Sequence, residues 1–206
     1  MKFSCEKALL QSMITIASRA VAPKSTIPAL EGVLLEAEQE LNLTGYNLKT
    51  GIRGTISADI AEPGSIVLSA RLFGDIIRRL PDDMVTLSTD DLMVNITCGM
   101  SEFNILGMDP SQFPELPAVE YQNSMILPQR ILHSMITETI FAVSTNDSRP
   151  IHTGELFERN GEGLLTVVAV DGYRLALRRE TTQLNVSETA CQFVIPAPAL
   201  NEVSKI

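Results

Sequence analysis

The chain has 206 residues, a length that suits one large domain or two of ordinary size. Of these residues 45% are hydrophobic, enough to form a buried core. Its net charge of −9 argues against a protein that grips nucleic acid by overall electrostatic attraction. The sequence has no apolar run near the ~20 residues of a membrane span, no signal peptide, and no Cys-x-x-Cys pair among its three cysteines. We therefore expect a cytoplasmic protein without a membrane segment, a disulfide framework, a metal or another cofactor.

The first predicted element is an amphipathic helix over residues 6–21, because its apolar residues recur at helical spacing. A polar loop that contains Pro28 follows, and an apolar strand is expected over residues 32–37. Residues 52–59 and 92–98 alternate between apolar and polar side chains. This alternation is typical of antiparallel strands with one buried and one solvated face.

A second helix is predicted between these later strands, over residues 71–80, and Pro81 ends it. The order of helix, strands, helix and strands indicates an α+β domain whose helices cover one face of antiparallel sheets. Three prolines within residues 109–117 predict a linker at the end of this domain.

The first helix and strand return later in the chain. Ser12-Met13-Ile14-Thr15 recurs as Ser134-Met135-Ile136-Thr137, 122 residues further on, and 14 of the 35 positions from Leu10 to Thr44 are identical at this shift. Unrelated segments would share roughly two such identities, so the repeat indicates a duplicated domain. The second copy should begin with a helix over residues 128–143 and continue, after Pro150, with a strand.

This repeat predicts two domains, residues 1–117 with the linker at their end and residues 118–206. Val194-Ile195-Pro196-Ala197 resembles Val67-Leu68-Ser69-Ala70, which introduces the second helix of the first domain. The second domain would then stop inside its own second helix. We therefore expect a truncated second domain with poorly packed residues near its end, in a fragment of a longer protein.

The charge is unevenly distributed between the predicted elements. The predicted helices together have a net charge of about +3, whereas the remaining residues have about −12. This pattern fits a molecule whose helical face meets a polyanion and whose sheet face repels it. Ordinary solvated surfaces explain the pattern equally well.

Several segments resemble, in order and spacing, those of one known family. They are Met1-Lys2-Phe3, Ser25-Thr26-Ile27-Pro28, Leu41-Asn42-Leu43-Thr44-Gly45, Ser69-Ala70-Arg71, Phe113-Pro114, Gly154-Glu155-Leu156-Phe157-Glu158 and Val170-Asp171-Gly172-Tyr173-Arg174-Leu175-Ala176. The chain is similar, over its whole length, to the bacterial DNA polymerase III beta subunits, the beta sliding clamps. The resemblance implies a DNA-clamp fold of repeated α+β domains and a non-catalytic processivity factor for a DNA-directed DNA polymerase.

In that family each chain has three domains, and two chains form a homodimer ring that encircles duplex DNA without reading its sequence. The helices line the hole and the sheets lie outside. This chain would supply the first domain and most of the second, and the third domain is absent. The resemblance assigns Phe103 and Ile105 to the edge that closes the ring. Because the partner edge belongs to the third domain, we expect no closed ring from this fragment.

The family's partner pocket receives short peptide motifs from DNA polymerase III, the clamp loader and repair proteins. The matching positions are Arg149, His152, Val170, Gly172, Tyr173, Arg174 and Leu175. His152 stands where the family usually has an apolar residue and Val170 where it often has Thr, so pocket specificity is expected to differ. Taken without the family, Asp171-Gly172 is typical of a plain hairpin turn.

For DNA, the resemblance and the basic residues of the second helix together suggest Lys24, Arg71, Arg78, Arg79 and Asn146, each able to donate to phosphate. Solvated surface residues are the alternative interpretation for each of them. Ala197 and Pro198 replace a pair that is basic in some members, so the DNA contacts of this chain should be fewer.

Two other classes of function are alternatives. An enzyme is disfavoured because His133 and His152 lack a nucleophile or second histidine at an informative spacing, and the chain has no Gly-rich phosphate loop. The other alternative is a protein-interaction scaffold of duplicated α+β domains that does not bind DNA. It shares every feature except the basic helical face.

Overall fold

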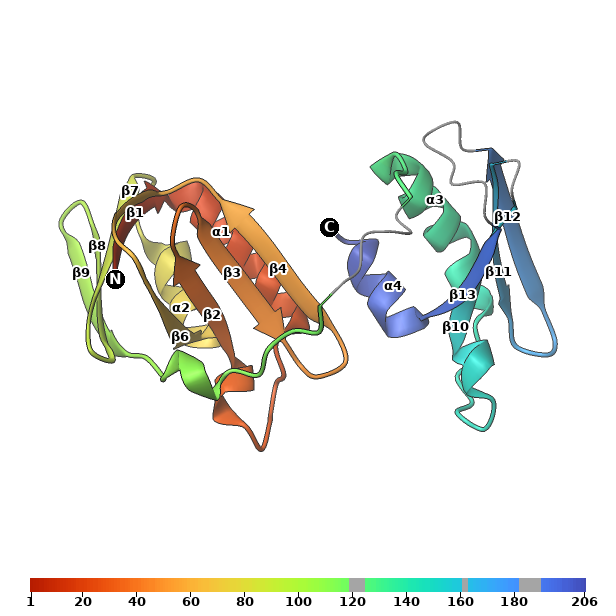
Figure 1. Ribbon diagram of the computed structural model, residues 1–206, viewed down its shortest axis with the longest axis horizontal. Coiled ribbons are helices and arrows are strands. Elements are labelled where there is room, and N and C mark those ends of the chain that lie inside the picture. The colour runs from red at the N-terminus through yellow and green to blue at the C-terminus, as the bar shows by residue number, and fades with distance from the viewer. Residues whose placement is uncertain (119–124, 161–162, 182–189) are drawn as a thin grey trace. The chain divides into compact units, whose positions relative to one another are not determined.

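The computed structural model describes residues 1–118, 125–160, 163–181 and 190–206 (Figure 1). The chain divides into two compact units, unit 1 (Met1–Pro117) and unit 2 (Ala118–Ile206). Both are built of helices packed on antiparallel sheets, so the predicted α+β class is confirmed.

Unit 1 contains two helices and two sheets. Its helices are α1 (Lys7–Ala17) and α2 (Ala70–Arg79), and its strands are β1 (Lys2–Glu6), β2 (Gly32–Ala37), β3 (Leu41–Tyr46), β4 (Gly51–Ile56), β5 (Asp59–Glu62), β6 (Gly64–Ser69), β7 (Met84–Asp90), β8 (Met93–Cys98) and β9 (Ser101–Leu106). Short 3-10 turns lie at Ser18–Ala20, Pro28–Glu31 and Pro110–Gln112. The strand orders are β4-β3-β2-β6 and β5-β1-β7-β8-β9, with antiparallel neighbours throughout.

The predicted strand over residues 52–59 is in fact two strands that belong to different sheets. β4 pairs with β3, whereas β5, which begins at Asp59, pairs with β1. The chain therefore crosses from one sheet to the other between Ile56 and Asp59. The apolar–polar alternation continues across this crossing, so periodicity alone could not locate it.

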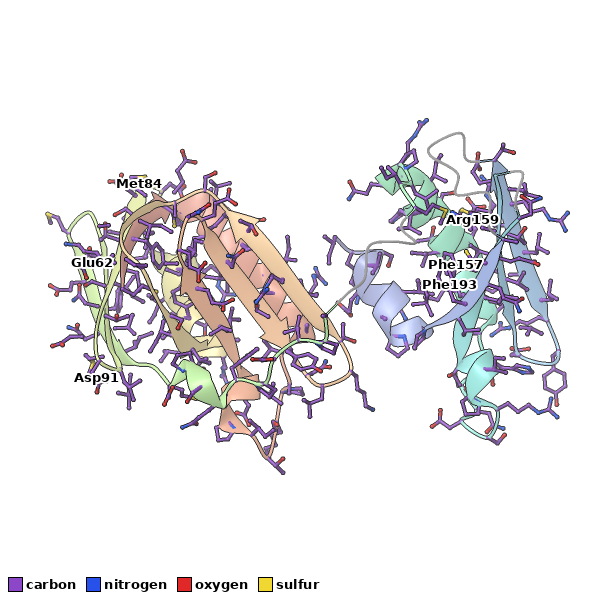
Figure 2. All side chains as sticks on the ribbon, viewed as in Figure 1. Glu62, Met84, Asp91, Phe157, Arg159 and Phe193 are labelled. Carbon is purple, nitrogen blue, oxygen red and sulfur yellow. The ribbon has the colours of Figure 1, made fainter. Side chains whose placement is uncertain are left out.

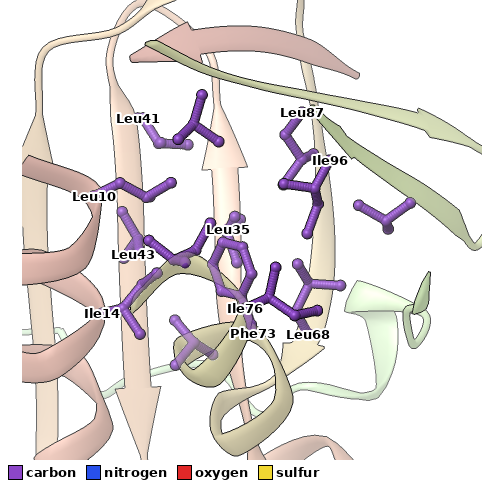
Figure 3. Packing of buried hydrophobic residues seen from close by; sticks show 14 of the residues in the cluster. Leu10, Ile14, Leu35, Leu41, Leu43, Leu68, Phe73, Ile76, Leu87 and Ile96 are labelled. Atoms are coloured by element: carbon purple, nitrogen blue, oxygen red, sulfur yellow. The ribbon is translucent and has the colours of Figure 1, made fainter. Parts of the chain in front are cut away.

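One core joins both helices of unit 1 to both of its sheets. Figure 3 shows Leu10 and Ile14 of α1 beside Leu41 and Leu43 of β3, Phe73 and Ile76 of α2 beside Leu35 and Leu68, and Leu87 and Ile96 from the second sheet. Phe73 is fully buried, and truncating such a side chain to alanine typically costs about 3–5 kcal/mol. The two helices lie side by side on the β4-β3-β2-β6 sheet because their apolar faces share this core.

Unit 2 repeats half of this plan. Its elements are α3 (Gln129–Thr139), 3-10 turns at Ile140–Ala142 and Pro150–Thr153, β10 (Gly154–Arg159), β11 (Leu164–Val170), β12 (Leu175–Thr181), β13 (Cys191–Pro196) and α4 (Ala197–Val203). The strand order β12-β11-β10-β13 matches β4-β3-β2-β6 of unit 1. Among the described residues of unit 2 there is no counterpart of the five-stranded sheet.

The sequence repeat coincides with the structural one. At the shift of 122 residues, the bounds of α1, its 3-10 turn, the next 3-10 turn and β2 fall on those of α3, its two turns and β10. The strand register is also kept, since Gly32 pairs with Ser69 and Gly154 with Pro196. Near the end of the chain α4 packs through Leu200, which is 2% exposed, whereas the apolar Val203 and Ile206 beyond it are 47% and 49% exposed.

The two units fill equivalent core positions differently. The inward face of β2 carries Val33, Leu35 and Ala37, and the same face of β10 carries Glu155, Phe157 and Arg159. Phe157 stacks on Phe193 of β13, with ring centroids 5.7 Å apart and planes at 6° (Figure 2). Unit 2 therefore has a smaller apolar core that contains a buried carboxyl group.

Candidate functional site

The largest group of predicted site residues surrounds a cavity of about 410 Å³ in unit 2. Its walls are the loop between α3 and β10 and the hairpin turn between β11 and β12. The lining residues are Val143, Ser144, Thr145, Asn146, Ser148, Arg149, His152, Asp171, Tyr173 and Arg174. Polar side chains dominate this wall, which suits recognition of a peptide backbone or a charged side chain.

Asp171 holds the hairpin turn in place. Its Oδ1 accepts hydrogen bonds from the backbone N–H groups of Tyr173 at 3.0 Å and Arg174 at 3.1 Å. These bonds stabilise the carboxylate and lower the pKa of Asp171. The intervening Gly172 has φ +94°, a left-handed conformation that glycine adopts without strain.

The same aspartate orients Arg174. Asp171 Oδ2 accepts a hydrogen bond from Arg174 Nε at 2.8 Å, and the guanidinium carbon lies 5.8 Å from the centre of the Phe141 ring. The ring and the carboxylate restrain the side chain on two sides. Its remaining N–H groups can donate to a bound peptide. Tyr173 is fully exposed and Leu175 is 63% exposed, so both can present apolar surface to a ligand.

The opposite wall is a loop closed on itself by hydrogen bonds. The backbone N–H of Ser144 donates to the carbonyl oxygen of His152 at 2.8 Å, which ties the two ends of the loop together. Inside it, Ser144 Oγ accepts from the N–H of Asn146 at 3.0 Å, and Asn146 Oδ1 accepts from the N–H of Ser148 at 2.9 Å. Asn146 thus shapes the loop from within.

The structure brings some of the predicted pocket residues together and not others. Arg149, His152, Tyr173 and Arg174 line the cavity. Val170 and Leu175 form the last pair of the β11–β12 hairpin, outside the lining, and Gly172 lies in the turn between them.

Sequence reasoning missed several lining residues, among them Ser144, Thr145, Ser148 and Asp171. Asp171 could have been found, because an aspartate that precedes Gly in a turn commonly accepts the next backbone N–H groups. Asn146, predicted as a DNA contact, lies in the same wall as the peptide-pocket residues.

The residues of unit 1 that were predicted to contact DNA do not all lie in one groove. A groove of about 250 Å³ between α1 and α2 is lined by Arg71 and Arg78, and by Gln11, Thr15 and Ser18 across from them. Arg78 forms an ion pair with Asp75, one turn earlier on α2. Lys24 and Arg79 are exposed but lie outside this groove.

The predicted ring edge is β9, an outer strand of the five-stranded sheet. Phe103 is 39% exposed there, but Ile105 is 9% exposed and packs into the unit 1 core. The accessible side chains of β9 are therefore Glu102, Phe103, Asn104 and Leu106, the last 70% exposed, while Ile105 faces inward. An exposed edge strand of this kind can pair with a strand of another chain.

Two features are absent from the described residues. Within the described ranges, no cluster of three or more His, Cys, Asp or Glu side chains is arranged to hold a metal ion. The helices of the same ranges are all too short or too polar to span a membrane.

Comparison with known proteins identifies the family. Residues 1–117 match the DNA polymerase III beta subunit N-terminal domain, and residues 126–206 match the central domain of the same subunit. This chain belongs to the DNA polymerase III beta subunit family. The resemblance noted in the sequence is thereby confirmed, and the family is that of a non-catalytic accessory subunit of the polymerase.

Relatives agree along the whole chain. The beta sliding clamp of Halalkalibacterium halodurans is 36% identical over 217 residues, covering 100% of this chain and 57% of that protein. A crystal structure of a putative DNA polymerase III beta subunit from Eubacterium rectale has a TM-score of 0.94 at 37% identity, and the Bacillus subtilis sliding clamp has 0.93 at 32%. Both comparisons cover 100% of this chain and 56% of the other. The chain thus spans little more than half the length of these family members.

Proposed function

We propose that the full-length protein is a processivity factor that encircles duplex DNA and tethers the replicative polymerase in the bacterial cytoplasm. The observation that carries this proposal is the pair of consecutive family domains, N-terminal then central, in one chain whose fold matches solved beta subunits. A ring holds DNA by topology, so its strongly acidic composition does not oppose the function. Tight phosphate contacts would instead give salt-dependent binding and hinder sliding.

The α1–α2 groove of unit 1 is the proposed DNA-facing surface. Arg71 and Arg78 supply positive charge there, and Thr15, Ser18 and Gln11 supply neutral donors. Such groups contact phosphate and sugar rather than base edges, so binding would be independent of sequence. Because Arg78 already pairs with Asp75, its contribution to DNA binding should be smaller than that of Arg71.

The unit 2 cavity is the proposed site for short peptide motifs of DNA polymerase III, the clamp loader and repair proteins. Arg174 is held ready to donate by Asp171 and Phe141, and exposed Tyr173 and Leu175 offer apolar contact. Preorganised donors of this kind reduce the entropic cost of binding. A third domain would complete the pocket, so we expect only weak peptide binding by residues 1–206 alone.

A DNA-retention experiment tests the proposal. The full-length protein is loaded by its clamp loader onto nicked circular DNA, and retention is measured by gel filtration in high salt before and after the DNA is linearised. A sliding clamp stays on the circle and runs off the linear form. Equal retention on both forms, or none on the circle, would favour the scaffold alternative. Residues 1–206 alone should show no stable DNA-encircling dimer by light scattering.

A further inference from the structure

Unit 2 contains a buried polar pair where unit 1 has an apolar one. Glu155 of β10 and Thr139 at the end of α3 are 0% and 1% exposed, and the equivalent residues of unit 1 are Val33 and Ala17. Glu155 Oε1 lies 2.8 Å from Thr139 Oγ1. Glu155 Oε2 has no hydrogen-bond partner within the described part of the chain. An isolated carboxylate in such a place is costly, so its protonation state needs an explanation.

The hydrogen-bond geometry is compatible with a proton on Glu155. Thr139 Oγ1 is 2.7 Å from the backbone oxygen of Met135 as well as 2.8 Å from Glu155. A hydroxyl group donates one hydrogen, and a backbone oxygen only accepts. If Thr139 donates its one hydrogen to Met135, it has none left for Glu155. The short contact between the two side chains is then a hydrogen bond only if Glu155 is protonated and donates to Thr139 Oγ1. An ionised Glu155 would compete with Met135 for the single Thr139 hydrogen.

The surroundings favour the same state. On β13 the cross-strand partner of Glu155 is Ile195, and β11 carries no charged residue. Burial raises the pKa of Glu155 to about 7, even when Thr139 donates its hydrogen to the carboxylate, an arrangement that lowers the pKa. The titratable groups on the packed elements are Arg130, His133 and Glu138 on α3, His152 in the 3-10 turn, Glu158 and Arg159 on β10, Arg178, Arg179 and Glu180 on β12, Cys191 on β13, Glu202 on α4, and Lys205 in the turn after α4.

Several of these groups are directed elsewhere or lie at a distance. Arg130, His133 and Glu138 are exposed, and Glu138 forms an ion pair with Arg178 at 3.2 Å. Arg159 is on the same face of β10 but four residues along, about 13 Å at the rise of a strand. No charged group of the described residues contributes to the pKa rise, which comes from burial.

The pair joins the two ends of the pocket loop, defined here as residues 140–154. Thr139 precedes this loop and Glu155 follows it, and most of the residues that line the unit 2 cavity belong to it. Thr139 is also where α3 gives way to a 3-10 turn, with φ −123° and ψ −33°. A bond across this point restrains the loop from its base, in addition to the link between Ser144 and His152.

We propose that Glu155 and Thr139 form a protonation-dependent clasp that positions the pocket loop. With the proton on Glu155 the clasp is closed and the loop is ordered. Ionised Glu155 draws water or moves toward solvent, and the loop loses this restraint. The two residues are positioning residues and do not touch a ligand. The clasp stands independently of what the pocket binds, and only its effect on peptide affinity rests on the function proposed above.

The first test measures the proton and the loop directly in the full-length protein. The carboxyl carbon of Glu155, labelled with ¹³C, is titrated by NMR and should change shift near pH 7, well above an ordinary glutamate. Amide hydrogen exchange of the pocket loop, corrected for the intrinsic pH dependence, should quicken at least tenfold between pH 6 and pH 8.5. A Glu155 titration below pH 5, or loop exchange without this pH dependence, would overturn the proposal.

Variants separate the clasp from a general packing role. In Glu155→Gln the amide donates to Thr139 as the neutral acid does, so loop exchange should stay slow across the whole pH range. The Thr139→Ala variant should exchange fast at both ends of the range. The matched control is Glu158→Gln, an exposed residue of the same strand, which should keep the wild-type pH profile. If Glu155→Gln retains that profile too, the clasp is wrong.

Peptide binding tests whether the clasp affects the proposed function of the pocket. A synthetic peptide of the polymerase's clamp-binding segment should bind the full-length protein several-fold more weakly at pH 8.5 than at pH 6. In Glu155→Gln this pH difference should be clearly smaller than in the wild type, because only the contribution of Glu155 is removed and every other pocket group is present in both proteins. If the peptide binds neither protein at either pH, the proposed pocket function fails while the exchange data still decide the clasp. A peptide difference of the same size in Glu155→Gln as in the wild type counts against the clasp.

Discussion

Replacing the buried pair of unit 2 by its unit 1 counterpart, as the double variant Thr139→Ala/Glu155→Val, should change the pH dependence of stability. Folding raises the pKa of Glu155 from an ordinary 4.5 to about 7, so the folded state keeps a proton that the unfolded chain releases. The free energy of unfolding therefore falls as pH rises from about 4.5 to about 7, and is flat above that range. This pKa rise means that the free energy of unfolding is lower at pH 8 than at low pH by about 3 kcal/mol.

The double variant has no such group, so its unfolding free energy should vary less over this range. Valine is smaller than glutamate, and the space left should cost about 1 kcal/mol. We therefore expect the variant to be about 2 kcal/mol more stable than the wild type at pH 8 and no more stable at pH 5. Thr139→Ala alone removes a partner of a buried carboxyl group and should destabilise unit 2 at both pH values by about 1–3 kcal/mol.

Hydrogen exchange of β10 and β11 amides, followed by mass spectrometry across a urea series at pH 5 to 8.5, measures this stability for unit 2 alone. A local probe is needed because two units need not unfold together. All other titratable groups are common to both proteins, so their contributions cancel in the difference. Parallel pH profiles for wild type and double variant would refute the assignment of a buried, proton-binding Glu155.

Three further changes test other parts of the structure. Gly45→Ala should destabilise unit 1 by about 1–3 kcal/mol in urea unfolding, because the new Cβ would lie 2.0 Å from the carbonyl oxygen of Ala17; unchanged stability would mean that α1 is not seated on β3 as described. The double variant Arg71→Ala/Arg78→Ala should make the dependence of DNA affinity on salt concentration less steep, by the equivalent of about one to two phosphate contacts. An unchanged salt dependence would show that this groove is not part of the DNA interface. Asp171→Asn should leave the hairpin folded by NMR but weaken peptide binding several-fold, since it frees Arg174; unaltered affinity would show that Arg174 needs no restraint.

Each of these changes has a matched control in the chain. Gly74→Ala, within α2, meets only Ile14 Cγ2 at 3.5 Å and should raise stability by about 0.5–1 kcal/mol. Lys49→Ala removes an exposed cation from the β3–β4 turn and should leave the DNA salt slope unchanged. Asp109→Asn alters a carboxylate whose pKa is likewise lowered by a backbone hydrogen bond, but in unit 1, and should not affect peptide affinity.

Much of the fold could be predicted because it follows from local pattern. The ungapped repeat located the helix, turn and strand of unit 2, since its identities fall where both units need the same backbone. The sheet crossing between Ile56 and Asp59 could not be seen, because alternation reports which face is buried and not which sheet a strand joins. Ile105 was predicted at the ring edge, but its side chain packs in the core. The sequence could not show this, because it does not reveal which face of the strand points inward.

The candidate site was harder to predict for a physical reason. Its walls come from two loops 19 or more residues apart in sequence, and their shape depends on individual bonds such as that from Ser144 N–H to His152. A loop held by one or two side-chain bonds leaves no periodic trace in a sequence. Glu155 was equally hidden, because β10 carries both Glu155 and Glu158 and the sequence alone does not show which of the two carboxyl groups is buried.

The same kind of hairpin turn occurs in both units, but only in unit 2 does it also hold a candidate binding residue. In unit 1, Asn47 Oδ1 accepts from the N–H groups two and three residues later, at 3.0 and 2.8 Å, as Asp171 does in unit 2. The interpretation of Asp171-Gly172 as a plain turn is therefore correct for the backbone. The units differ in charge: a neutral amide holds only the turn, whereas a carboxylate also holds Arg174 over Phe141. Because Asn47 already supports the same turn, Asp171→Asn separates the fold of this hairpin from its proposed function.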